Sequence, residues 1–223
     1  MKTSFWLVLV AAMMAASTTG CSSGLKYKVD DAALDNVSAG EKQGVFNAKN
    51  EIEVARSEYR NADSKLEALD RDRSVAKNEK KQADLEVEKA ATEEEAAVAS
   101  RDENRHNAAK HGKEVAALGV KVAEAKLDWL DQKEDALKAE RSAAEAHQRA
   151  AEAKTELEKA KLAQQKGIKP DGDFAVGNYE SQWKDKNSDW ESAKKDAASE
   201  DKKATDREQK WKEMVAQHQK LHG

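Results

Sequence analysis

Two histidine pairs are the first residues of this chain to consider as metal ligands. His218 and His222 lie four residues apart, which places both on one face of a helix, but no cysteine and no evident third ligand accompanies them. His106 and His111, five residues apart, do not share a helical face well. We therefore expect no metal site, and we interpret His218 and His222 as basic side chains at the end of a helix.

Acidic clusters and tryptophans offer the remaining chemistry. The acidic run 93–95 stands among lysines in helical sequence, which is typical of a solvated face rather than of a general acid and base pair. No glycine-rich phosphate loop follows a strand pattern. Trp129, Trp183, Trp190 and Trp211 could form an aromatic ligand platform, but all four fall on an apolar seam, where core packing is the ordinary explanation. We expect no catalytic residue, no cofactor and no small-molecule substrate, and hence no enzyme.

The composition favours long helices over a compact domain. Charged residues make up 37% of the chain and aromatic residues 5%. Glutamate and lysine mixed with alanine and leucine are typical of long surface helices. Lysine and arginine number 39 against 43 for aspartate and glutamate, with both signs interleaved, so no basic stripe could follow a phosphate backbone. We expect no nucleic-acid partner.

Residues 1–20 have the plan of a secretory signal peptide. Lys2 precedes the apolar run 5–16, and small residues follow at 17–20. The apolar run is too short to span a bilayer. Conventional cleavage near Ala16 would leave Cys21, the single cysteine, as a free thiol.

The tetrad Thr18, Thr19, Gly20, Cys21 points to a different fate for this cysteine. It resembles the bacterial lipobox, although Thr18 stands where leucine is usual. The resemblance implies that Cys21 carries fatty-acyl chains such as palmitate and becomes the mature amino terminus. Several chains on one residue would anchor the protein without a membrane span. Ser22 rather than aspartate after the cysteine implies an outer-membrane lipoprotein that faces the periplasm.

Residues 21–37 are predicted to form a lipidated tether with one turn around Ala32 to Leu34. A capping box at Ser38 and Glu41 then predicts the start of a helix. Apolar residues recur at alternating spacings of three and four. The positions are Val45, Ala48, Ile52, Ala55, Tyr59, Ala62, Leu66 and Leu69.

This seam weakens over 73–111, where charged residues occupy several of its positions, which indicates either a flexible zone or a docking surface. It recovers in the same register over 115–160 and is rich in alanine. An alanine seam lets helices approach closely but specifies partner number poorly. Because the register is unbroken, we predict one continuous or kinked helix over 38–166, on the order of 190 Å long. A hairpin folded at Gly112, after Lys110 and His111, is the alternative.

A turn is predicted at 167–173, where Gly167 suits a left-handed cap, Ile168 its apolar contact, Pro170 blocks helix continuation and Asp173 can cap the next helix. A third amphipathic helix is predicted over 174–222. The short loop favours antiparallel packing on the preceding helix, with the tryptophans over alanine positions. The fold class is therefore all-α, a long alanine-rich coiled coil followed by an antiparallel helix.

We expect a non-enzymatic lipoprotein of the cell envelope that acts as a tether, spacer or assembly scaffold through coiled-coil contacts with itself or a protein partner. The lipobox and the seam are generally similar to those of alanine-zipper murein lipoproteins, but the chain ends in Leu221, His222 and Gly223 rather than in the lysine that those proteins join to the wall. The alternative is a periplasmic binding module, such as a helical-arm holdase chaperone or an accessory subunit of an envelope transport or motility complex.

Overall fold

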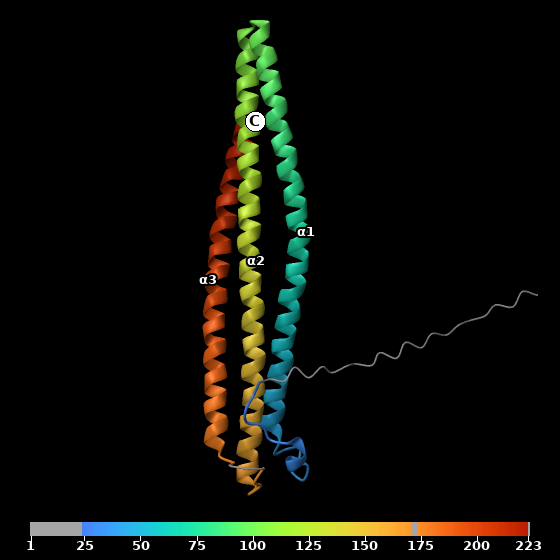
Figure 1. Cartoon of the computed structure of the whole chain (residues 1–223), viewed down its shortest axis with the longest axis vertical. Coiled ribbons are helices and arrows are strands. Elements are labelled where there is room, and N and C mark those ends of the chain that lie inside the picture. The colour runs from blue at the N-terminus through green and yellow to red at the C-terminus, as the bar shows by residue number, and fades with distance from the viewer. Residues whose placement is uncertain (1–23, 171–173, 223) are drawn as a thin grey trace, which may run out of the picture.

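The protein folds as three long antiparallel helices side by side (Figure 1). A computed structural model describes residues 24–170 and 174–222. A short 3₁₀ helix, η1 (Asp31–Leu34), precedes α1 (Gln43–Ser100), α2 (Glu103–Gln165) and α3 (Val176–His222). The predicted all-α class and the antiparallel carboxy-terminal helix are confirmed. None of the helices in the described ranges is long and apolar enough to cross a membrane.

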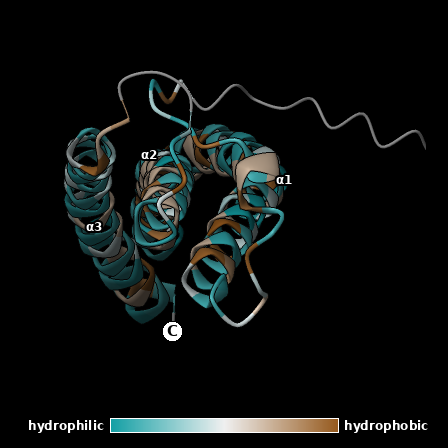
Figure 2. Ribbon diagram, turned by 90° about the horizontal axis from the view of Figure 1, so that it is seen from below, coloured by the Kyte–Doolittle hydropathy of each residue, from teal (hydrophilic) through white to brown (hydrophobic). Residues whose placement is uncertain are grey.

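The middle helix, α2, packs against both others, whereas α1 and α3 do not pack against each other in the part of the chain that is described. Seen along its length, α2 lies between α3 on one side and α1 on the other (Figure 2). Residues of all three helices line a shared hollow, and we call the face that carries it the trough. We call the end that carries the α2–α3 connection and residues 24–42 the base, and the opposite end, where α1 meets α2, the tip.

The prediction of one continuous helix over 38–166 is wrong, because the chain reverses at Arg101 and Asp102. Arg101 adopts the left-handed conformation, with φ 57°, and its N–H donates to the carbonyl of Val98 at 3.2 Å. The Asp102 carboxylate then caps α2 by accepting the N–H of Arg105 at 3.1 Å. The alternative, a hairpin, is confirmed, but the chain folds back at 101–102 and not at Gly112, which lies inside α2. The Asp102 cap marks the start of a new helix, which the unbroken heptad register does not indicate.

The heptad seam of the first helix is confirmed. Of the eight predicted positions, five are buried and three half-buried. The seam residues Leu69 and Ala76 pack against Leu130 and Leu137 of α2. Burial continues in the same register to Ala97, which is 1% exposed.

The weakened stretch of this seam is explained by ion pairs between α1 and α2. Three of its charged seam positions meet an opposite charge on the facing helix. The pairs are Arg73 with Asp131 at 2.6 Å, Lys80 with Glu124 at 3.7 Å and Glu94 with Lys113 at 2.6 Å.

The central helix buries two rows of side chains, of which the sequence pattern predicted one. The predicted seam over 115–160 is buried or half-buried throughout. A second row recurs at every seventh residue and is also buried: Ala116, Ala123, Leu130, Leu137, Ala144 and Ala151. Because α2 has a neighbour on two sides, it needs two apolar faces. Alanine on both faces lets the three backbones lie close together.

The amino-terminal segment is not the free tether that the sequence predicted. From residue 24 onward it lies against the base of the bundle, and Leu25, Val29, Leu34 and Val37 are buried. The predicted turn is present as η1. The apolar side chains of this segment enter the cluster formed by the ends of α2 and α3, because burying them there removes apolar area from water. We call residues 24–37 the strap.

The helix ends match the predicted caps in part. Glu41 accepts the N–H of Ser38 at 3.3 Å and its hydroxyl at 2.8 Å, which is the glutamate half of the capping box, and α1 begins at Gln43. After the end of α2, Gly167 has φ 66°. The Ile168 N–H donates to Ala163 O at 2.9 Å, which completes the predicted left-handed cap. Asp173 lies outside the described residues.

Candidate functional site

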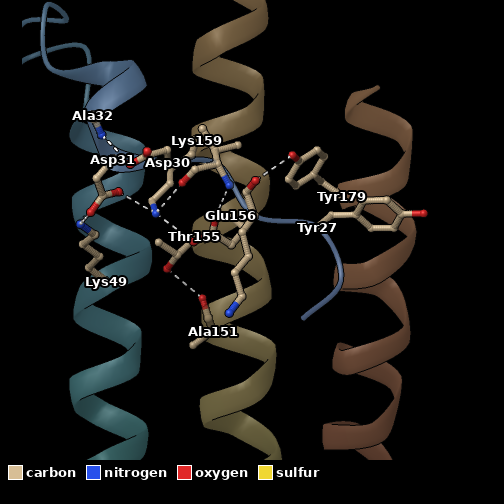
Figure 3. A network of polar contacts seen from close by, with 12 residues as sticks. Tyr27, Asp30, Asp31, Ala32, Lys49, Ala151, Thr155, Glu156, Lys159 and Tyr179 are labelled. Carbon is tan, nitrogen blue, oxygen red and sulfur yellow. Dashed lines mark hydrogen bonds and ion pairs between the residues drawn. The ribbon is translucent and has the colours of Figure 1, made fainter. Parts of the chain in front are cut away.

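A groove at the base, between the end of α2 and the start of α3, holds the strap through its main chain (Figure 3). Gln182 of α3 accepts the N–H groups of Lys26 at 2.8 Å and Tyr27 at 3.0 Å, and its amide N–H donates to Tyr27 O at 2.9 Å. The Tyr179 hydroxyl donates to Lys28 O at 3.2 Å. Side chains of α3 thus hold the strap through three consecutive residues of its main chain.

A buried ion network fixes the next part of the strap. The Glu156 carboxylate accepts the N–H of Val29 at 2.7 Å. The Lys159 ammonium, whose side chain is 8% exposed, lies 2.8 Å from Glu156 and 2.7 Å from Asp31. Lys49 of α1 reaches Asp31 from the other side at 3.4 Å. The network therefore joins the strap to α1 and α2 together.

The charges of this network stabilise one another. Burial by itself would lower the pKa of Lys159, but hydrogen bonds to Asp31 and Glu156 outweigh burial and raise that pKa above its usual value. The hydrogen bond from Lys159 lowers the pKa of Asp31. Burial, with the charge of Glu156, raises the pKa of the Tyr179 hydroxyl. Lys159 and Asp31 consequently keep their charge, and Tyr179 stays neutral, at neutral pH while they hold the strap.

A ladder of charged side chains joins α1 to α2 along the trough. Its members are seven or fourteen residues apart on each helix, and the two residues of a pair are equally far along the chain from the turn at the tip. The pairs are Glu51 with Lys154, Glu58 with His147 and Lys65 with Glu140, each at 2.8 Å, and Glu79 with Lys126 at 2.5 Å. In the Lys65 pair the glutamate lies on α2, whereas in the other pairs it lies on α1. The ladder therefore favours this register of α1 against α2 over registers shifted along the helices.

The α2 members of the ladder also meet α3, where a row of residues at sevenfold spacing faces them. His147 stacks on Trp190, with ring centroids 4.1 Å apart and planes 5° apart. The Lys126 ammonium lies 5.9 Å from the centroid of Trp211. These side chains of α2 are held between a carboxylate of α1 and an aromatic ring of α3, and they form the floor of the trough.

The aromatic row is interrupted in the middle of the trough, where α3 carries alanine at 197 and 204. A cavity of about 690 Å³ opens beside Ala197. Leu69, Leu137 and alanines of all three helices line its apolar part. Five charged residues surround it: Lys65, Asp72, Lys133, Glu140 and Asp201. We call this the central cavity; its size and mixed lining suit a large amphipathic side chain or a small molecule.

The tryptophans expected in the core are half-buried on the helix faces that meet. They do not all lie over alanines, as predicted, because Trp129 of α2 stacks on Trp211 of α3 with centroids 4.9 Å apart. Trp183 packs against the apolar cluster at the base. The prediction of packing over alanine is therefore wrong for this pair.

The histidine pairs lie near the tip. The rings of His218 and His222 are 5.4 Å apart, and no group of three histidine, cysteine, aspartate or glutamate side chains that could hold a metal is found within 24–170 and 174–222. His111 contacts the carbonyl oxygen of Leu221 at 3.0 Å. His106 keeps one ring nitrogen buried without a hydrogen bond.

Cys21 and the predicted signal peptide lie outside the described residues. The groove at the base was missed in the sequence, although the alternation of Leu25, Tyr27 and Val29 is the strand-like pattern that would have shown it. Comparison of the chain with protein-family models, curated proteins and solved structures gives no match. Function must therefore be inferred from the residues of this chain.

Proposed function

We propose that this protein is a non-enzymatic lipoprotein of the cell envelope that acts as a structural tether, spacer or assembly scaffold. The sequence supports an anchor at Cys21 in the outer membrane with the body in the periplasm. Only Ser22 and Ser23 separate Cys21 from the first described residue. The observation that carries the proposal is the docking of the strap at the base, because it connects the residues next to the anchor to the helices.

An anchor next to the base would direct the helices away from the bilayer as one arm. The 58 residues of α1 correspond to a length of about 87 Å. This reach is about half of what a continuous helix over 38–166 would give. The docked strap and the ladder between α1 and α2 would keep the arm from bending at the base, as a spacer requires.

The anchor is tested with Cys21→Ala, compared with the unchanged chain in cells fed a fatty-acid analogue. We expect the unchanged chain to carry the label and to fractionate with membranes, and Cys21→Ala to lose both. Continued membrane fractionation and labelling of Cys21→Ala would contradict the anchor. Cys21→Ser serves as a second variant. It should behave as Cys21→Ala does, and a difference between the two would reveal an effect of alanine itself at the cleavage site.

A binding module is the second candidate, and the central cavity favours it. The proposed partner residue is a large amphipathic side chain that fills the space between Ala197 and the charged rim. A holdase chaperone would need a continuous apolar surface, whereas the large exposed apolar residues of the described helices stand eight or more positions apart along α1, with one more at the end of α3: Phe46, Val54, Val75, Leu85, Val98 and Leu221. An accessory subunit of a larger envelope complex is the form of this candidate that the surface supports.

Ala197→Trp tests the second candidate by filling the cavity, and Ser199→Trp, two residues away at an exposed position, is the matched control. In-cell crosslinking of both variants should recover the same envelope protein from the control and not from Ala197→Trp. Equal recovery from both would show that the cavity does not bind the partner and would leave the spacer.

A further inference from the structure

The groove at the base contacts its occupant mostly through the main chain of the occupant. Three hydrogen bonds with Gln182 and one each with Tyr179 and Glu156 all involve main-chain groups of residues 26–29. Two apolar side chains of the same segment, Leu25 and Val29, are buried beside them. Recognition through the main chain and two apolar side chains places few demands on the rest of the peptide sequence.

The strap and its groove belong to distant parts of the chain. The bond from Val29 to Glu156 spans 127 residues, and the bonds from Lys26 and Tyr27 to Gln182 span 156 and 155. The groove is built from α2 and α3, whereas the strap continues into α1. None of these bonds depends on the strap and the groove being in the same molecule, and a second copy presents the same groove with the same charges.

The strap is long enough to reach a neighbouring molecule. Extended from Ser38, it could span on the order of 45 Å, whereas a helix with its side chains is about 10–12 Å across. Neighbours side by side, with their bases at one level, thus lie within its reach. Fewer contacts restrain the strap than restrain the helices, so it is the segment of the described chain that can exchange at least cost.

We propose that the groove at the base is a peptide-binding site whose further occupant is the strap of a second copy of this chain. Exchange of straps between neighbours links the molecules base to base, with Asp31 of one chain paired to Lys159 of the next. Each molecule offers one strap and one groove, so the contact joins two different surfaces. It can therefore continue from molecule to molecule into rings or rows. The proposed lipid anchor would raise the local concentration of straps, but the contact itself does not depend on the anchor.

The test uses two complementary variants of the full chain, both with Cys21→Ser so that no lipid is attached. The donor, Gln182→Ala with Tyr179→Phe, keeps its strap and loses four of the five main-chain bonds of its groove. The acceptor, Leu25→Asp with Val29→Asp, keeps its groove and disables its strap. Sedimentation should show monomers for each alone and a 1:1 heterodimer in the mixture, in which the donor's strap occupies the acceptor's groove.

The controls separate this contact from any other association. A chain that carries all four substitutions should pair with neither variant, and restoring Gln182 alone should strengthen its binding of a labelled peptide of residues 24–37 by roughly 100-fold, from three hydrogen bonds. Circular dichroism verifies that every variant is helical. The proposal is overturned if the folded acceptor binds neither the donor nor the peptide. Loss of membrane anchoring in Cys21→Ala would leave this result unchanged, so the two proposals fail separately.

Discussion

Reversing the charges of Lys65 and Glu140 tests the antiparallel register of α1 and α2. The two side chains form an ion pair at 2.8 Å and are 45% and 44% exposed. At that exposure an ion pair contributes about 0.2–1 kcal/mol. Lys65→Glu replaces this attraction by a repulsion of similar size, and Glu140→Lys does the same. Each single variant should therefore lower the free energy of unfolding by about 0.5–1 kcal/mol, whereas the double variant should restore it.

Urea denaturation followed by circular dichroism measures this double-mutant cycle, at low salt because screening weakens exposed pairs. A coupling energy of about 1–2 kcal/mol between the two sites is expected from the reversal. Lys65→Glu combined with Asp135→Lys is the control, because Asp135 is exposed on α2 and belongs to no pair of the ladder; here the effects should add. Additive effects in the Lys65 and Glu140 cycle would refute the register of the ladder and, with it, the reversal of the chain at the tip.

Three further perturbations address the core, the strap and the tip. Leu130→Ala should lower the free energy of unfolding in urea by about 2–5 kcal/mol because Leu130 is 1% exposed, whereas Val75→Ala, at a position 54% exposed, should change it by less than about 0.5 kcal/mol. The folded pKa of Asp31 lies below its ordinary 3.8, so its contribution is present above that pH and is lost as the pH falls through the lower folded value. Proteolysis within the strap should then accelerate in acid, and Asp31→Asn should be cleaved faster already at neutral pH. An unchanged cleavage rate would show that the Asp31 carboxylate does not hold the strap. Asp102→Ala should cost about 1 kcal/mol in thermal or urea unfolding, and no loss would mean that the cap is dispensable.

The sequence pattern predicted the local features of this fold well. Alanine, leucine and charged residues at heptad spacing predicted helix over nearly the whole body, and the positions of the first seam are buried as expected. Gly167, Ile168 and Pro170 predicted the end of α2, because a left-handed cap depends on residues that are neighbours in the chain. The turn at η1 was likewise a local signal.

The reversal at the tip could not be settled by the heptad count. The seam continues through Ala97 and resumes at Val115 in one register, so the count alone favours a single helix. The residues of α2 that face α1 belong instead to the second row, which includes Ala123 and Leu130, displaced from the predicted seam by about 100° around the helix. Only the pattern of polar residues recorded the pairing, since Glu51 and Lys65 find their opposite charges, and Glu58 finds His147, in reverse order on α2.

By itself the sequence determined that this chain is helical and which alanines its helices bury. It also predicted a signal peptide followed by a tetrad that resembles a lipobox. These properties follow from interactions within one or two helical turns. The tertiary structure decided that α2 lies between two helices, that a central cavity opens beside Ala197, and that the strap docks at Gln182 and Lys159. Those outcomes bring together residues far apart in the chain, up to 156 positions for the bond from Lys26 to Gln182, and the free energy that selects them comes from packing, which no local pattern contains.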